Sequence, residues 1–141
     1  MADAPDLHRF LAAQVDSYER ALAELERGRK ESHWMWFVFP QLAGLGHSAM
    51  SRRYAIASAQ EARRYLAHSL LGSRLVECTS AVLAHRHRPI DAILGSVDAL
   101  KFRSSMTLFE AVAGAPEQCF GDALRAFYDG EPDSATLRLL R

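Results

Sequence analysis

The chain has 141 residues, of which 17 are basic and 17 acidic, so its formal net charge is zero at pH 7. This balance provides no overall field to attract nucleic acid or an anionic membrane, and a hydrophobic content of 49% is ordinary for a soluble globular protein. The N-terminus lacks the charged and apolar segments of a signal peptide. We therefore expect one cytoplasmic domain over residues 1–141, with neither nucleic acid nor membrane as a partner.

Residues 6–28 predict two short helices. Asp6 is placed to cap the first, whose apolar residues recur at helical spacing. Asp16, followed three residues later by Glu19, forms a capping-box pattern that is expected to start the second. Gly28 is placed to end that helix, because glycine readily adopts the left-handed conformation common at helix C-termini.

The next segment, Lys30–Gln41, holds both tryptophans, Trp34 and Trp36, in an unbroken apolar run. Such a run is apolar on every face, so we expect it to be buried on all sides. The proline that follows the run disfavours helical geometry at the residue before it, so any helix begun at Ser32 is brief. A lone buried extended segment over Trp36–Phe39 is the alternative.

The rest of the chain predicts further short helices, and no run alternates with the period of two that a strand requires. The clearest capping box is Ser58 with Glu61. The basic His85–Arg88 cluster is expected at a solvated helix C-terminus, where positive charge is favourable. We predict a compact all-α bundle of about seven short helices around the buried Trp/Phe-rich segment. The other expected helix starts are Ser48 or Ser51, the residues after Gly72, Pro89, Asp98, the residues around Phe120, and Ser134.

The two cysteines, Cys78 and Cys119, have no CxxC spacing and no disulfide framework. They are expected to be reduced, buried thiols. No sequence motif for a metal or a cofactor is present, so neither is predicted.

Polar side chains at the two ends of the Lys30–Gln41 segment make it the first candidate site. Lys30 and Gln41 could contact a ligand, and the tryptophan faces could stack on a base. His33 has two readings. It is either a partly buried residue whose ring nitrogens bond to nearby backbone, or a site residue that exchanges a proton near neutrality.

The second candidate lies in the helix expected to begin at Asp98. Lys101, Ser104 and Ser105 are three and four residues apart, so they share a face of that helix. Lys101 also has two readings: an ion-pair partner of Asp98 whose stem covers apolar surface, or an amine free to attack a carbonyl carbon. Because both segments combine apolar surface with polar groups that need partners, we expect them to pack together and bring His33 and Lys101 to one polar patch.

An ordered set of residues over nearly the whole chain matches one known family. On these residues the chain resembles the bacterial family numbered 1810 among the domains of unknown function, whose members are often labelled calpastatin. The resemblance implies an all-helical cytoplasmic domain and no established activity. The matching residues are Gly28-Arg-Lys30, Ser32-His-Trp-Met-Trp36, Phe39-Pro-Gln41, Leu45-Gly46, Ser48, Tyr54-Ala-Ile, Glu61-Ala62, Tyr65-Leu66, Leu71-Gly72, Arg74-Leu75, Gly95, Asp98, Lys101 and Ser104-Ser-Met-Thr-Leu-Phe109.

A second, shorter similarity involves Glu61-Ala62 and Lys101-Phe102. At these positions the chain resembles the YbiA-like family, which removes ADP-ribose from guanine bases. Members of that family also carry a lysine-phenylalanine pair, and the resemblance implies that Lys101 takes part in chemistry.

Two functions stay open from the sequence. The first is a site for a nucleotide or ADP-ribose-like ligand, with hydrolysis of an N-glycosidic bond as the candidate reaction. The second is a protein-interaction or structural module without catalysis, whose polar residues only cap and satisfy a packed core. The oligomeric state is left undecided. In the first function the catalytic residues are Lys101 and His33, and the ligand-binding residues are Lys30, Trp34, Trp36, Gln41, Asp98, Ser104 and Ser105.

Overall fold

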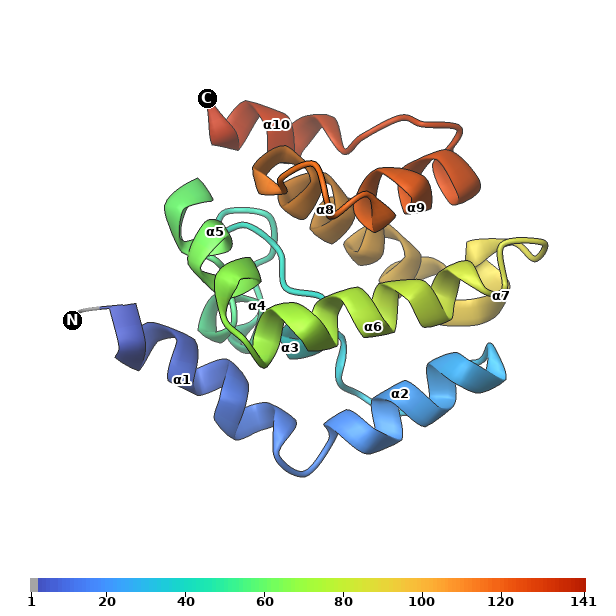
Figure 1. Ribbon diagram of the computed structural model, residues 1–141, viewed down its shortest axis with the longest axis horizontal. Coiled ribbons are helices and arrows are strands. Elements are labelled where there is room, and N and C mark those ends of the chain that lie inside the picture. Colours follow the sequence, from blue (N-terminus) through green and yellow to red (C-terminus); the bar gives the residue numbers. More distant parts are fainter. Residues whose placement is uncertain (1–2) are drawn as a thin grey trace.

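A computed structural model describes residues 3–141, with side chains from Leu7 onward, and this part of the chain forms ten helices and no strand (Figure 1). The predicted all-α class is confirmed. The count exceeds the prediction because three pieces are single turns of four or five residues. The helices are α1 (Asp3–Gln14), α2 (Tyr18–Arg27), α3 (Met35–Val38), α4 (Ala49–Arg53), α5 (Ala59–Ala67), α6 (Leu71–Leu83), α7 (Ile90–Leu94), α8 (Ser96–Val112), α9 (Cys119–Tyr128) and α10 (Ser134–Leu140).

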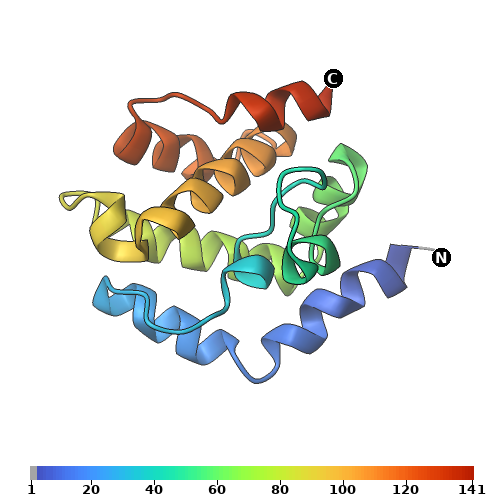
Figure 2. The same cartoon turned by 180° about the vertical axis from the view of Figure 1, so that it is seen from behind.

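Helix α6 crosses the middle of the molecule, with α1 and α2 on one side and α8, α9 and α10 on the other (Figure 1). The view from behind shows α3 and the loops next to it filling the space between α1 and α8 (Figure 2). One isolated parallel bridge, between Leu42 and Ile56, ties the loop after α3 to the segment after α4. The apolar run from Trp34 to Phe39 therefore lies mostly inside the bundle, as predicted, and Trp36 is its one partly exposed residue.

Aromatic side chains from α8 and from the residue that directly follows α3 meet in the core. The Phe39 and Phe102 rings pack edge to face with centroids 4.9 Å apart, and both side chains are fully buried. Trp34 is 1% exposed, so its predicted burial is confirmed. Trp36 is only partly buried. Residues 35–38 form one helical turn, so the alternative of an extended segment at Trp36–Phe39 is wrong.

Several predicted helix ends are confirmed. Gly28 ends α2 in the left-handed conformation, with a φ of +78°, and its N–H donates to the Leu25 carbonyl at 3.0 Å. Ser58 caps α5 by accepting a hydrogen bond from the Glu61 N–H at 3.2 Å. In a capping box, the Glu61 carboxylate would accept a hydrogen bond from the backbone N–H of Ser58. Here it accepts one from the N–H of Ala57, the residue before Ser58, at 2.7 Å.

Three predicted helix starts are wrong. Helix α1 begins at Asp3, so Asp6 lies inside it. Helix α2 begins after Ser17, whose hydroxyl donates to the Ala13 carbonyl, so Asp16 is not its cap. Helix α8 begins at Ser96, which places Asp98 in its first turn. In each case a neighbouring residue starts the helix, and the carboxylate of Asp98 is left available for contacts outside α8.

The basic His85–Arg88 cluster follows α6 as predicted, but two of its residues contact the end of α2. The His85 Nε2 lies 3.0 Å from the Glu26 carbonyl oxygen, and the Arg88 guanidinium donates to the Gly28 carbonyl at 2.9 Å. The two side chains thus satisfy orphan carbonyls at the C-terminus of a neighbouring helix, and the Arg88 guanidinium adds a positive charge there. The cluster fixes the position of α2 against the segment after α6.

Within residues 3–141, no helix combines the length and the apolar character needed to cross a bilayer. Cys78 is buried and Cys119 partly buried, and both are free thiols.

Candidate functional site

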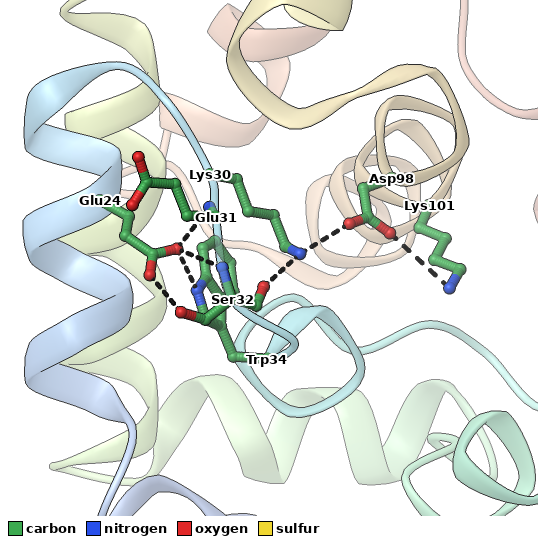
Figure 3. A network of polar contacts seen from close by, with 7 residues as sticks. All are labelled: Glu24, Lys30, Glu31, Ser32, Trp34, Asp98 and Lys101. Atoms are coloured by element: carbon green, nitrogen blue, oxygen red, sulfur yellow. Dashed lines mark hydrogen bonds and ion pairs between the residues drawn. The ribbon is translucent and has the colours of Figure 1, made fainter.

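A buried carboxylate organises the turn between α2 and α3. The Glu24 side chain belongs to the last full turn of α2 and points into the Glu31–Trp34 segment (Figure 3). Its Oε1 accepts hydrogen bonds from the backbone N–H groups of Glu31 and Ser32 and from the Trp34 indole, at 2.8, 2.9 and 2.8 Å. Its Oε2 accepts from the Ser32 hydroxyl at 2.5 Å. One carboxylate therefore fixes both the backbone of the turn and the orientation of a buried tryptophan.

These hydrogen bonds determine the charge state of Glu24, which is 2% exposed. Burial alone would raise the pKa of its carboxyl group, but the bonds from Ser32, Glu31 and Trp34 outweigh burial and lower the pKa from 4.5 to about 2. Glu24 is thus a buried anion at neutral pH, with its charge balanced by dipoles instead of a cation.

Sequence reasoning missed Glu24, although a signal was present. Tyr18, Ala21 and Leu25 form the buried stripe of α2, and Glu24 lies on the same stripe. A charged residue within an apolar stripe needs a partner.

Lys30 lies at the other side of the same turn. Its backbone N–H donates to the Ile93 carbonyl at 2.7 Å, and its ammonium donates to the Ser32 carbonyl at 2.5 Å. The ammonium is 2.9 Å from Oδ2 of Asp98 and 4.9 Å from the centre of the Trp34 ring. Only 8% of this side chain is exposed. Lys30 is therefore a buried cation with a complete set of partners, and it joins the turn to α8 (Figure 3).

Lys101 approaches the same carboxylate from within α8. Its ammonium is 3.7 Å from Oδ1 of Asp98 and 4.8 Å from the centre of the Trp36 ring, and 23% of its side chain is exposed. The Trp36 indole Nε1 is buried and has no hydrogen-bond partner among the described residues. We name Lys30, Trp36, Asp98 and Lys101 the lysine patch. Within it, Lys101 is the more exposed and more loosely paired cation.

From the sequence, Lys101 is interpreted either as an ion-pair partner of Asp98 or as a free amine. The ion pair between the two side chains is the one expected under the first interpretation. His33 is exposed, so the reading as a partly buried residue is wrong. It makes no hydrogen bond, ion pair or ring contact with any described residue, Lys101 included.

The remaining predicted ligand-binding residues lie apart from the exposed side of the lysine patch. Trp34 is sealed in the core, and its indole donates to Glu24. Ser104 donates to the Leu100 carbonyl of its own helix at 3.2 Å, and the Ser105 hydroxyl is buried without a partner in the described chain. Gln41 lines a separate hollow beyond α3. The predicted face of α8 that carries the serines thus points into the core, which the spacing alone could not decide.

The lysine patch has the chemistry of an anion site. Two ammonium groups share one carboxylate, which leaves one unit of positive charge on the patch. Among the described residues, no group of three or more His, Cys, Asp or Glu side chains is placed to hold a metal ion.

Comparison with known proteins shows one family. Residues 4–140 match the family described as "Protein of unknown function (DUF1810)". The crystal structure of the conserved hypothetical protein Rv1873 from Mycobacterium tuberculosis is 49% identical in sequence, covers 96% of each chain, and superposes with a TM-score of 0.93. No curated protein matches the chain. None of these findings supports the similarity to the YbiA-like family.

Proposed function

Because the chain belongs to the DUF1810 family, whose description names no activity, we propose its function from the site alone: the lysine patch binds a small anionic ligand of the nucleotide or ADP-ribose type. The observation that carries the proposal is the position of Lys101. Its side chain is 23% exposed, and its ammonium lies over the Trp36 ring, 4.8 Å from the ring centre.

Three members of the patch and one neighbouring residue each have a distinct part in this proposal. Lys101 meets a phosphate of the ligand as a point charge, since an ammonium can turn its three donors toward any oxygen. Asp98 holds the two ammonium groups in place, and buried Lys30 fixes Asp98 against the turn after α2. Val97, which is 65% exposed and one turn before Lys101, offers apolar surface to a base or ribose.

The proposal covers binding and includes no reaction. Hydrolysis of an N-glycosidic bond needs a carboxylate or histidine free to act on water. The Asp98 carboxylate is engaged by both lysines, and His33 makes no contact with the patch.

Thermal unfolding in the presence of AMP, ADP and ADP-ribose tests the proposal, because a ligand that binds only the native state raises Tm. We expect at least one of these ligands to raise the Tm of the native protein and to have no effect on Lys101→Met. Without ligand, Lys101→Met should unfold within about 1 kcal/mol of the native protein, since the Lys101–Asp98 pair is loose at 3.7 Å and methionine keeps an apolar stem at this position.

The matched control is Arg125→Met, which removes one positive charge from α9, where Arg125 pairs with Asp122. This variant should keep the full response to ligand. An equal loss in both variants would mean that the response reflects overall charge, and no response of the native protein to any of the three ligands would reject the proposal.

A protein-interaction module is the second candidate. Val97 and Leu100, which are 65% and 67% exposed, place two large apolar side chains on the first two turns of α8. Under this function none of the three ligands raises Tm, and replacing both side chains by serine leaves the unfolding free energy within about 0.5 kcal/mol, because neither is part of the core.

A further inference from the structure

We propose that the loop between α3 and α4 forms a second site, which binds a phosphate group. The site is a hollow of about 140 Å³ whose lining includes Gln41, Gly44, Gly46, Ser51 and Arg52. Its ligand is inorganic phosphate or the phosphate of a small phosphomonoester. The proposal does not depend on the lysine patch, because no residue of that patch lines the hollow.

The lining offers donors that have no partner. The side chains of Gln41 and Arg52 make no hydrogen bond or ion pair with any residue that the structure describes. The backbone N–H groups of Gly44 and Gly46 also donate no hydrogen bond within this part of the chain. The residues that carry this guanidinium, this amide and these two backbone N–H groups thus line one small hollow. Such a donor set fits the oxygens of a tetrahedral oxyanion.

The local charge also favours an anion. No aspartate or glutamate occurs between Glu31 and Glu61, while Arg52 and Arg53 both lie in that stretch. No acidic side chain lines the hollow. The Arg52 guanidinium also forms no ion pair with a carboxylate of any described residue. A phosphate in the hollow would form charge-assisted hydrogen bonds with it.

The backbone of the loop lets a ligand approach closely. Gly44 has a φ of +100°, which strains any residue with a side chain. A Cβ atom at Gly46 would lie 2.5 Å from the Ser51 hydroxyl oxygen, so the loop passes α4 too closely for a larger residue. Because neither residue has a side chain, neither places atoms beyond the backbone in the hollow. A volume of about 140 Å³ exceeds the roughly 30 Å³ share of one water molecule several times over.

Amide NMR of the full chain tests the site, with sodium phosphate and, separately, glycerol 3-phosphate as probes at constant ionic strength maintained with sodium chloride. We expect saturable shifts of the amides in residues 44–52 with at least one probe. The Arg52→Met variant should bind that probe about tenfold more weakly or worse, because hydrogen bonds to charged groups are the strong ones. The Arg52 side chain is exposed and forms no hydrogen bond or ion pair with a described residue, so this variant should keep the native spectrum elsewhere.

The matched control is Arg53→Met, which removes the same charge from the adjacent residue, whose guanidinium lies over the Tyr54 ring 5.5 Å from its centre. We expect this variant to bind within about twofold of the native protein, and Lys101→Met likewise, since neither residue lines the hollow. A tighter fit of glycerol 3-phosphate than of phosphate would identify the ester as the source of the group.

Three results would overturn the site: no saturation with either probe, shifts confined to residues outside 41–55, or equal weakening by Arg52→Met and Arg53→Met. A failure of the proposal for the lysine patch is recognised by a different experiment. That experiment measures whether nucleotides raise Tm and whether Lys101→Met abolishes the increase.

Discussion

Glu24 allows a quantitative test of how the turn after α2 is held. The exchange Glu24→Gln keeps the shape of the side chain but removes its charge, and with it the charge-assisted character of four hydrogen bonds. The pKa of Glu24 is lowered from 4.5 to about 2, a difference of roughly 2.5 pH units. At about 1.4 kcal/mol per unit, the ionised carboxylate contributes about 3 kcal/mol to the free energy of unfolding at pH 7.

The same shift predicts the pH dependence and its sign. Below pH 4.5 the unfolded chain protonates Glu24 first, because its folded-state pKa is lower. The contribution is therefore complete above pH 4.5, falls by about 1.4 kcal/mol per pH unit below it, and is gone near pH 2. Since glutamine does not titrate, the difference between the native protein and Glu24→Gln should shrink over that range.

Urea unfolding, followed by tryptophan fluorescence at pH 7, 5, 4 and 3.5, measures this difference. The control is Glu31→Gln, because the Glu31 side chain is 57% exposed and only pairs with Arg27 at 3.7 Å. That variant should cost no more than about 0.5 kcal/mol at pH 7. A cost of Glu24→Gln below about 1 kcal/mol at pH 7, or one that stays constant down to pH 3.5, would refute the reasoning.

Three further predictions follow from burial. Trp34→Ala should cost about 3–5 kcal/mol in urea unfolding and Trp36→Ala clearly less, because Trp34 is 1% exposed and Trp36 is partly exposed. Gly72→Ala should destabilise by about 1–3 kcal/mol, since its Cβ would lie 2.0 Å from a backbone carbonyl of α5; Gly121→Ala, whose Cβ would meet only the ends of flexible side chains at 3.3 Å or more, should be tolerated. Burial raises the pKa of the Cys78 thiol to about 12, so it should not react with a thiol reagent at pH 8 until urea unfolds the chain; reaction of the native protein at this position would contradict its burial.

The helical class and several helix ends could be predicted from the sequence because their causes are local. Gly28 stops α2 through its own backbone conformation, and Ser58 caps α5 through a hydrogen bond to a residue three positions away. The apolar run around Trp34 has no polar face to expose, so the burial of Trp34 followed from composition alone, whereas Trp36 in the same run is only partly buried. The wrong starts at Asp6, Asp16 and Asp98 were each displaced by a few residues, which is the usual error where adjacent polar residues compete for one cap.

The candidate site could be predicted from the sequence only in part. Sequence spacing put Lys101 on one face with two serines, but which face of α8 is exposed depends on what packs against it. Phe39 packs on Phe102, and the serines are turned inward with the other core residues. His33 adjoins a buried run, yet the turn before α3 leaves it in solvent.

By itself the sequence determined what is set within one or two helical turns: the helical class, the stop at Gly28, the cap at Ser58 and the burial of the tryptophan segment. Only the tertiary structure decided which charges meet. Glu24 finds no cation but four N–H and O–H donors, and Lys30 pairs with an aspartate in a helix far along the chain. Such contacts arise when separate helices dock, because a buried charge must then take whichever partner the docked neighbours present.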